Sequence, residues 1–388
     1  MFAICSDLDH AVSLTAYLEF LKYLNTDIDT CYGTGLGLEV SNSCWFYNGE
    51  NDQQLSYFKG TTTEESTFAP VCRDLWTSGH IDTLHSYGNF NLGGFDRSFA
   101  EPALEALTRH GATLPVWVNH GNDQNHQKLG LLPEFQGAKP DKNAYHYDLL
   151  KESGTRFFWM GRTTHVAGQD AQFNLSNQVQ QQLQKLILAT KYRNTERPLP
   201  DPENRLLLET TLEDGHEILE FQRFISRFGE VKKTDLFDLA LQLSQQNLKA
   251  LVKSEGFMVL YTHMNENLPQ SQPLPLEVSQ GFQRLARFAR EKSLLVTTSS
   301  RLLNYADLTK KLIWKTRIKG GSTEISLTQS DPRPLKVADL QGLTFYCDTP
   351  EKTVLFLNDK QITTDVNPTD HTGRGSLSVP WQALEYPF

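Results

Sequence analysis

The strongest constraint on the fold is an alternation of short apolar runs and amphipathic stretches over the first 300 or so residues. Phe2–Cys5 is typical of a buried strand, and apolar side chains recur at helical spacing after Ser13, a suitable helix N-cap. About seven strand-then-helix units of this kind are typical of a parallel α/β architecture. We therefore expect residues 1–310 to form an irregular barrel of the (β/α)7 type, with an open doubly wound sheet as the alternative.

The remaining expected elements can be given by range. Strands are expected at 36–47, 81–85, 114–118, 156–160, 206–210, 257–262 and 294–297, and helices at 68–77, 100–110, 144–153, 235–253 and 276–291. The polar segment 166–204 is expected to hold a helix and a loop. From about Lys311 the pattern changes to segments that alternate polar and apolar residues, such as Thr353–Leu357. This change predicts a second domain, a small C-terminal β-sandwich over residues 311–388.

Charge and hydropathy exclude two classes of partner. The 388 residues include 37 Lys and Arg against 46 Asp and Glu, a formal net charge of −9. Phosphate backbones are bound through clustered basic side chains, and the chain has no long basic run, so we expect no nucleic-acid partner. No apolar run approaches the roughly 20 residues of a membrane-spanning helix, so we expect no membrane insertion.

Cysteine usage and the opening segment bear on the compartment. An odd number of scattered cysteines fits neither a disulfide framework nor a CxxC zinc site, and it favours a reducing compartment. These residues are Cys5, Cys31, Cys44, Cys72 and Cys347. The segment Met1–His10 carries acidic residues and no basic n-region of a signal peptide. The predicted location is therefore cytoplasmic.

Polar side chains gather where the predicted strands end. They are Asp7, Asp9, His85, His120, Arg162 and His263. The carboxyl ends of the strands carry the active site in α/β barrels, so we expect these side chains to converge. Asp7 and Asp9 share one face of a strand, where one carboxylate can bind a cation while the other acts as a base. The alternative for this pair is an N-cap and turn before the first helix.

Three of these segments resemble motifs of the polysaccharide deacetylase family. Gly79–Phe90 is similar to the second motif, in which a Gly-His opening precedes a metal-binding His and, four residues later, another. Asp7 and Asp9 resemble the Asp-x-Asp form of the first motif, and Leu260–His263 resembles the Leu-x-His of a late strand. The segments occur in the family's order within residues 1–305, whereas the family's Arg-x-Pro-Tyr signature has no clear copy.

This resemblance implies a metal-dependent hydrolase that removes an N- or O-acyl group from a sugar. In the family's arrangement Asp7 is the catalytic base, Asp9 and His85 are metal ligands, and His263 is the general acid. The implied cofactor is a divalent metal, zinc by preference, and no organic cofactor is expected.

Asn89 departs from the family pattern, because it stands where the second metal-binding His belongs. A carboxamide oxygen is a weaker zinc ligand than an imidazole nitrogen. Asp9, His85 and Asn89 would therefore hold zinc loosely, or another imidazole would complete the site. The candidates are His10, His80 and His120.

A further set of residues is expected to bind the carbohydrate substrate. It consists of His80, His120, Asn122, Trp159 and Arg162. Trp159 suits stacking on a sugar ring, and the planar guanidinium of Arg162 suits pairing with a carboxylate or orienting the base. The alternative for Trp159 is a place in the barrel core.

Two other functions stay open. A glycosidase on a related barrel would need a carboxylate facing the first pair, with Asp82, Asp123 and Asp170 as the candidates. A non-catalytic sugar-binding relative would have lost the metal. The sugar, the acyl group, the role of the C-terminal domain and the oligomeric state are not determined by the sequence.

Overall fold

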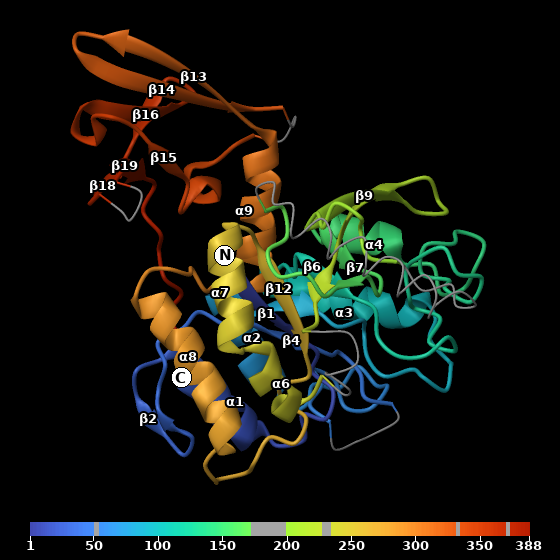
Figure 1. The fold of residues 1–388 in the computed structure, drawn as a ribbon. Coiled ribbons are helices and arrows are strands. Elements are labelled where there is room, and N and C mark those ends of the chain that lie inside the picture. The colour runs from blue at the N-terminus through green and yellow to red at the C-terminus, as the bar shows by residue number, and fades with distance from the viewer. Residues whose placement is uncertain (50–53, 172–198, 227–233, 331–333, 370–372) are drawn as a thin grey trace. The chain divides into compact units, whose positions relative to one another are not determined.

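The protein is described here by a computed structural model of residues 1–49, 54–171, 199–226, 234–330, 334–369 and 373–388 (Figure 1). It is a mixed α/β protein with two compact units. The first unit comprises Met1–Leu302 together with Leu384–Phe388, and the second comprises Leu303–Ala383. Most of the predicted segment 166–204 lies outside the described residues.

The first unit is built on two sheets of mainly parallel strands. One sheet has the order β1 (Phe2–Ser6), β12 (Met258–Thr262), β11 (Arg223–Phe224), β8 (Thr163–Thr164). The other has the order β4 (Asn42–Cys44), β5 (Ile81–Leu84), β6 (Val116–Val118), β7 (Phe157–Trp159), β10 (Glu217–Phe221), β9 (Leu207–Thr211). Among the described strand pairs of these two sheets, β9–β10 alone is antiparallel. Val296 makes a parallel bridge to Phe2, and a short hairpin joins β2 (Asp29–Thr30) to β3 (Gly33–Thr34).

Helices alternate with these strands along the chain, as the sequence pattern predicts. The described helices are α1 (Leu14–Asn25), α2 (Ala69–Ser78), α3 (Arg97–Arg109), α4 (Tyr147–Glu152), α6 (Leu236–Gln242), α7 (Gln245–Ser254), α8 (Leu276–Arg290) and α9 (Ser299–Lys311). Ser13 accepts a hydrogen bond from the Ala16 amide and caps α1. None of the described helices is long and apolar enough to cross a membrane.

Three expected elements differ from the structure. The expected strand at 294–297 is reduced to the single bridge between Val296 and Phe2. The expected strand at 36–47 is reduced to β4, because the amides of Leu36 and Leu38 donate to the carbonyls of Tyr23 and Leu24 at the end of α1. The expected helix at 235–253 is two helices, because Ser244 caps a new one by accepting from the Asn247 amide. The pattern did not predict β10, β11 or α9.

The second unit is β-rich and contains two sheets. One has the order β13 (Leu312–Lys319), β14 (Ser322–Gln329), β16 (Thr353–Leu357), β17 (Lys360–Ile362), and the other β15 (Thr344–Tyr346), β19 (Ser376–Ser378), β18 (Asp365–Asn367). Two short 3-10 helices, η1 (Val337–Leu340) and η2 (Pro350–Lys352), connect them. The β14–β16 pair is parallel. Buried Leu327, Leu355 and Leu377 from both sheets belong to one hydrophobic cluster.

The last five residues return to the first unit. The Leu384 amide donates to Glu39 Oε2 at 3.1 Å, and the Tyr386 hydroxyl donates to the Leu18 carbonyl at 3.0 Å. The Tyr386 ring also meets the His80 ring edge-on, with centroids 5.3 Å apart. The chain therefore leaves the first unit at residue 302 and rejoins it at 384.

Candidate metal centre

Strand register places the N-terminal aspartates beside His263. β1 and β12 are parallel neighbours in which Ser6 is opposite Thr262. Asp7 and His263 each directly follow one of these two strands, so both leave the sheet at the same edge. Asp9 lies two residues after Asp7, at the same edge of the sheet.

His85 and His120 come from the second sheet. His85 directly follows β5, and His120 lies two residues after the neighbouring parallel strand β6. Ser86 joins the two loops, because its hydroxyl donates to the Val118 carbonyl and accepts from the His120 amide. The Asn125 side chain also donates to the His120 carbonyl at 3.0 Å.

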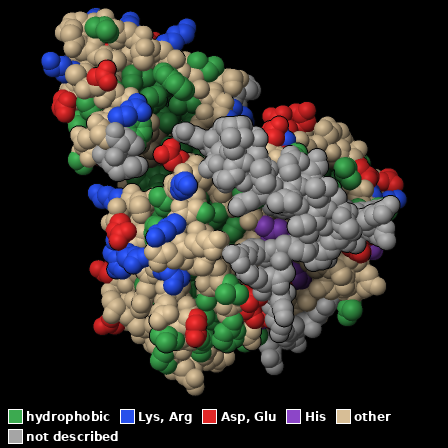
Figure 2. All heavy atoms as spheres, viewed as in Figure 1, with side chains coloured by type: hydrophobic (Ala, Val, Ile, Leu, Met, Phe, Trp, Pro, Cys, Tyr) green, Lys and Arg blue, Asp and Glu red, His purple; other side chains and the backbone are tan. Residues whose placement is uncertain are grey.

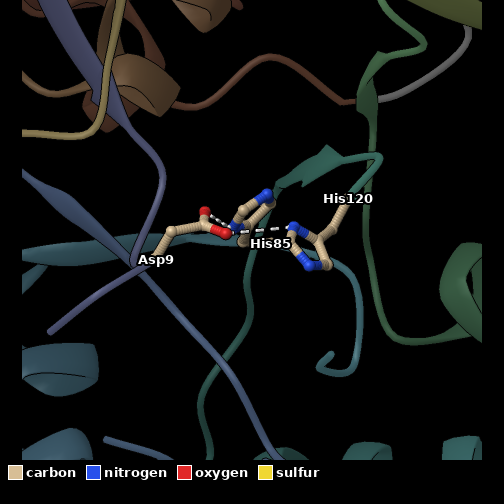
Figure 3. Close-up of side chains that lie close together, drawn as sticks. All are labelled: Asp9, His85 and His120. Atoms are coloured by element: carbon tan, nitrogen blue, oxygen red, sulfur yellow. Dashed lines mark ion pairs between the residues drawn. The ribbon is translucent and has the colours of Figure 1, made fainter. Parts of the chain in front are cut away.

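Asp9, His85 and His120 form a compact cluster (Figure 3). Asp9 Oδ2 lies 3.3 Å from His85 Nδ1, and Asp9 Oδ1 lies 3.3 Å from His120 Nδ1. Two ligand atoms about 2.0 Å from a tetrahedral zinc ion lie about 3.3 Å apart. The spacing of these oxygen and nitrogen atoms therefore fits a shared cation.

The facing atoms of Asp9 and His85 are also unpartnered. Asp9 Oδ2 and His85 Nδ1 are buried, and neither makes a hydrogen bond to any described residue. Buried polar atoms almost always have a partner, so an unpartnered pair indicates a missing ligand. One carboxylate and two imidazoles are a donor set that divalent zinc accepts. These three residues could therefore hold a metal ion.

Trp45 supports the two imidazoles. Its side chain is fully buried, stacks against His85 with centroids 5.7 Å apart, and meets His120 edge-on at 4.9 Å. The two imidazole rings themselves lie edge to face at 4.8 Å. Packing against Trp45 and against each other restricts the rotation of both rings and preorganises their nitrogen atoms.

Burial keeps His85 neutral. It lowers the pKa of the imidazole to about 4, although the carboxylates of Asp7 and Asp9 act in the opposite direction. A neutral imidazole is the form that binds a metal. The pKa of Asp9 is lowered too, because His120, His85 and His263 together outweigh the effect of burial.

Asp7 is held by a buried arginine. Arg223 Nη1 and Nη2 donate to the two carboxylate oxygens of Asp7 at 2.6 and 3.1 Å. The guanidinium lies between the rings of Trp159 and Tyr261, with Cζ 3.5 and 3.8 Å from their centroids. Burial alone would raise the pKa of Asp7, but Arg223, with His85 and His263, lowers it to about 2. Asp7 is therefore ionised at neutral pH.

His263 lies close to both aspartates. Its Nε2 lies 3.7 Å from Asp7 Oδ2 and 3.6 Å from Asp9 Oδ2. Its Nδ1 shares a hydrogen bond of 2.9 Å with the Thr234 hydroxyl, which holds the orientation of the ring. His263 is partly exposed, and Figure 2 shows histidine side chains at the surface of the first unit. Asp7, Asp9 and His263 make a second group of potential metal ligands.

Two residues that the sequence predicted to bind substrate or metal, His80 and Asn89, make other contacts. His80 precedes β5, so it lies at the opposite end of that strand from His85, where its Nδ1 meets the Ser78 hydroxyl. The side-chain oxygen of Asn89 accepts from the Asn91 amide at 3.2 Å, which makes a local turn. His120, from the next strand, supplies the imidazole that faces Asp9.

The remaining predicted residues, Asn122, Trp159 and Arg162, make the following contacts. Asn122 lies in the loop after β6, where its side chain accepts from the Gln124 amide. Trp159 is buried and packs on the Arg223 guanidinium, the kind of contact expected of a core residue. Arg162 pairs with the buried carboxylate of Glu220 at 3.0 Å. Glu220 is a residue of the protein itself, so the role of Arg162 in binding substrate or orienting the base stays a prediction.

Arg223 is the main residue that the sequence analysis missed. It lies in β11, next to Phe224 and close to Phe221, and it is fully buried. Arginine is almost never fully buried without a partner. An arginine within an apolar strand segment was therefore a usable signal for a buried carboxylate.

Comparisons with known proteins add no further assignment. No family model, no curated protein and no solved structure matches this chain.

Proposed function

We propose that this protein is a metal-dependent hydrolase that removes an acyl group from a carbohydrate. Asp9, His85 and His120 would hold a divalent cation, with zinc the expected ion. The observation that carries the proposal is the buried, unpartnered pair of Asp9 Oδ2 and His85 Nδ1 at 3.3 Å, with His120 Nδ1 at the same distance from the other Asp9 oxygen.

The surrounding residues suit hydrolysis of an acyl group. A bound cation would polarise the acyl carbonyl and lower the pKa of the attacking water. Asp7, ionised and oriented by Arg223, takes a proton from that water as the water oxygen bonds to the acyl carbon. His263 donates a proton to the leaving amine or alcohol when the bond between that atom and the acyl carbon breaks. The products are a carboxylic acid and the deacylated sugar.

The choice of a carbohydrate substrate rests on the resemblance of the motifs to the polysaccharide deacetylase family. The residues of all three motifs meet in the cluster: Asp7 and Asp9, His85, and His263. Arg223 holds the base in this chain, which has no Arg-x-Pro-Tyr segment.

The (β/α)7-type barrel and the sandwich also remain proposals. For the barrel, β7 and β8 belong to one chain segment, and β10 and β11 belong to another. β7 pairs with β10 in one sheet and β8 pairs with β11 in the other, and both of these pairs are parallel. The Arg223 amide donates to the Arg162 carbonyl between those pairs, which supports a continuous path from one sheet to the other. For the sandwich, the shared hydrophobic cluster of the two C-terminal sheets is the support.

The glycosidase alternative has less support. Asp82 Oδ2 accepts from the Ser300 amide at 2.6 Å, Asp123 is an exposed residue that pairs with Lys128, and Asp170 accepts from the Leu206 amide. Each of the three candidate partner carboxylates is thus already engaged by other groups.

Acetate release from N-acetylglucosamine oligomers and from acetylated xylan tests the proposal. We expect activity that EDTA abolishes and zinc restores, and an Asp7→Asn variant that loses several orders of magnitude in rate while keeping its metal. Full activity of Asp7→Asn would remove Asp7 as the base. Glycosidic cleavage that is indifferent to EDTA would favour the glycosidase. Purified protein without metal and without activity would favour a non-catalytic sugar-binding protein.

A further inference from the structure

Two buried carboxamides connect the loops that carry His85 and His120. Gln127 and Asn125 lie in the loop after β6, and both side chains are fully buried. Gln127 Nε2 donates to Asn125 Oδ1 at 2.7 Å, and Asn125 Nδ2 donates to the His120 carbonyl at 3.0 Å. The two carboxamides therefore form a path of hydrogen bonds that ends on the backbone of His120.

Gln127 also binds the loop after β5. Its Oε1 accepts from the Tyr87 amide, and its Nε2 donates to the Gly88 carbonyl, both at 2.7 Å. Tyr87 lies two residues after His85. The carboxamide thus uses its oxygen and both of its N–H groups, and it links the backbone that follows His85 to the backbone of His120.

Ser86 makes a second link between the same two loops. This residue directly follows His85 and is fully buried, and its hydroxyl contacts the His120 amide at 3.0 Å and the Val118 carbonyl at 3.1 Å. Its φ is +51°, in the left-handed region that residues other than glycine rarely adopt. Such a conformation persists only where the surrounding contacts fix the backbone, and it is common at functional sites.

These links bear on the metal centre because they act on the backbone behind the two imidazoles. The amide and the carbonyl of His120 are both held, and the His120 ring lies 4.8 Å from the His85 ring (Figure 3). A buried polar network whose members are satisfied is rigid. Ligands that are already in place lose less freedom when an ion binds, and residues behind the ligands typically change metal affinity by about 10–100-fold.

We propose that Gln127 is a positioning residue of the metal centre, which fixes the spacing between His85 and His120 before the ion binds. The inference rests on the proposed function, because the ion is the one that the hydrolase requires. It assigns a role in metal affinity to a side chain whose hydrogen bonds reach neither an imidazole nor a carboxylate.

Zinc affinity of the full-length protein tests this role without a substrate. The protein is freed of metal with EDTA and titrated with zinc against a chromogenic chelator, well below the melting temperature of each variant. We expect Gln127→Met, which keeps the length of the side chain and removes its hydrogen bonds, to lower the affinity at least tenfold. The matched control is Gln169→Met, because Gln169 is also fully buried but binds the Gln222 carbonyl and the Val259 amide. This control should lower the melting temperature and leave zinc affinity close to that of the wild type.

Two further variants separate positioning from general stability. Ser86→Ala removes a single oxygen atom, so it guards against misfolding of Gln127→Met, and it should also lower zinc affinity. In a His120→Ala background, Gln127→Met should have little further effect, because the spacing to His120 no longer matters. Unchanged affinity in Gln127→Met and Ser86→Ala, an equal loss in Gln169→Met, or an undiminished effect of Gln127→Met without His120 would overturn the proposal.

The result is distinguishable from that of the hydrolase assay. Acetate release by a protein whose zinc affinity is independent of Gln127 would remove the positioning role and leave the hydrolase standing. Zinc affinity that depends on Gln127 in a protein that releases no acetate would leave the positioning role standing and remove the hydrolase. A wild-type protein that binds no zinc would overturn both.

Discussion

The stability of the protein is expected to depend on the buried pair of Arg223 and Asp7. It is fully buried, pairs with both oxygens of Asp7 and lies between two aromatic rings. Removing one member of a buried pair leaves an uncompensated charge, which costs about 3–5 kcal/mol. We expect Arg223→Met to lower the free energy of unfolding by about that amount in urea titrations.

The double variant checks the cause. Arg223→Met leaves the buried carboxylate of Asp7 uncompensated, and Asp7→Asn removes that charge. The double variant should therefore recover most of the stability that Arg223→Met loses. A single Arg223→Met variant as stable as the wild type would contradict the burial of a charged pair.

The identity of the third ligand of the proposed metal ion is a second question at the residue scale. The structure points to His120, whereas the sequence motif places Asn89 at that position. We expect His120→Ala to lower zinc affinity at least tenfold in a competition titration with a chromogenic chelator, and Asn89→Ala to leave it close to that of the wild type. The reverse order of the two variants would restore the motif-based assignment.

The segment before α6 orients the imidazole of His263, the proposed general acid. Asp235 caps α6 by accepting from the amides of Phe237 and Asp238, and the adjacent Thr234 accepts from the His263 amide through its carbonyl. The Thr234 hydroxyl also meets His263 Nδ1. The position of the imidazole therefore depends on where this helix begins.

Thr234→Val should reveal that dependence. Val keeps the shape and removes the hydroxyl, so the imidazole loses the partner that holds its orientation. We expect kcat to fall about 10–100-fold with little change in KM, and Thr234→Ser to restore most of it. Equal kcat in the valine and wild-type proteins would show that the hydrogen bond has no role in proton transfer.

Most of what the sequence predicted about strands and helices came from the alternation of apolar and amphipathic segments. It located β1, β5, β6, β7 and β12, and therefore the strand ends that bear the aspartates and histidines. It could not locate β11, because two residues are too few for a periodic pattern, and Arg223 was missed with it. The break at Ser244 depends on a local cap that competes with a continuous helical pattern.

Buried histidines are expected to make the stability of the first unit depend on pH. Burial lowers the pKa of His146 and of His80 to about 4, from an ordinary value of 6.5. The His146 ring is fully buried and packs against Tyr87, Phe95 and Trp117. Each of these imidazoles gains a proton more easily in the unfolded chain than in the native protein.

Stability should therefore fall as the pH is lowered from about 6.5 to 4, by up to about 1.4 kcal/mol per pH unit for each such histidine. Urea titrations of metal-free protein measure the slope, because bound metal adds its own proton dependence. His146→Gln, which cannot be protonated, should give a shallower slope than the wild type. An identical slope would mean that His146 is not kept neutral by burial.

The contacts of Glu39 bear on how the second unit can be deleted from the chain. Its carboxylate receives both Arg301, beside the last residue of the first unit before the chain departs, and the amide of Leu384, where the chain comes back. The 81 residues of the second unit, 303–383, are thus an insertion in the sequence of the first unit, and Arg301 and Leu384, which flank the insertion, both bind Glu39. Deleting residues 303–383 and joining 302 to 384 through a short flexible linker would keep both contacts to Glu39. Truncating the chain near 302 would instead remove the hydrogen bond from the Tyr386 hydroxyl to the Leu18 carbonyl.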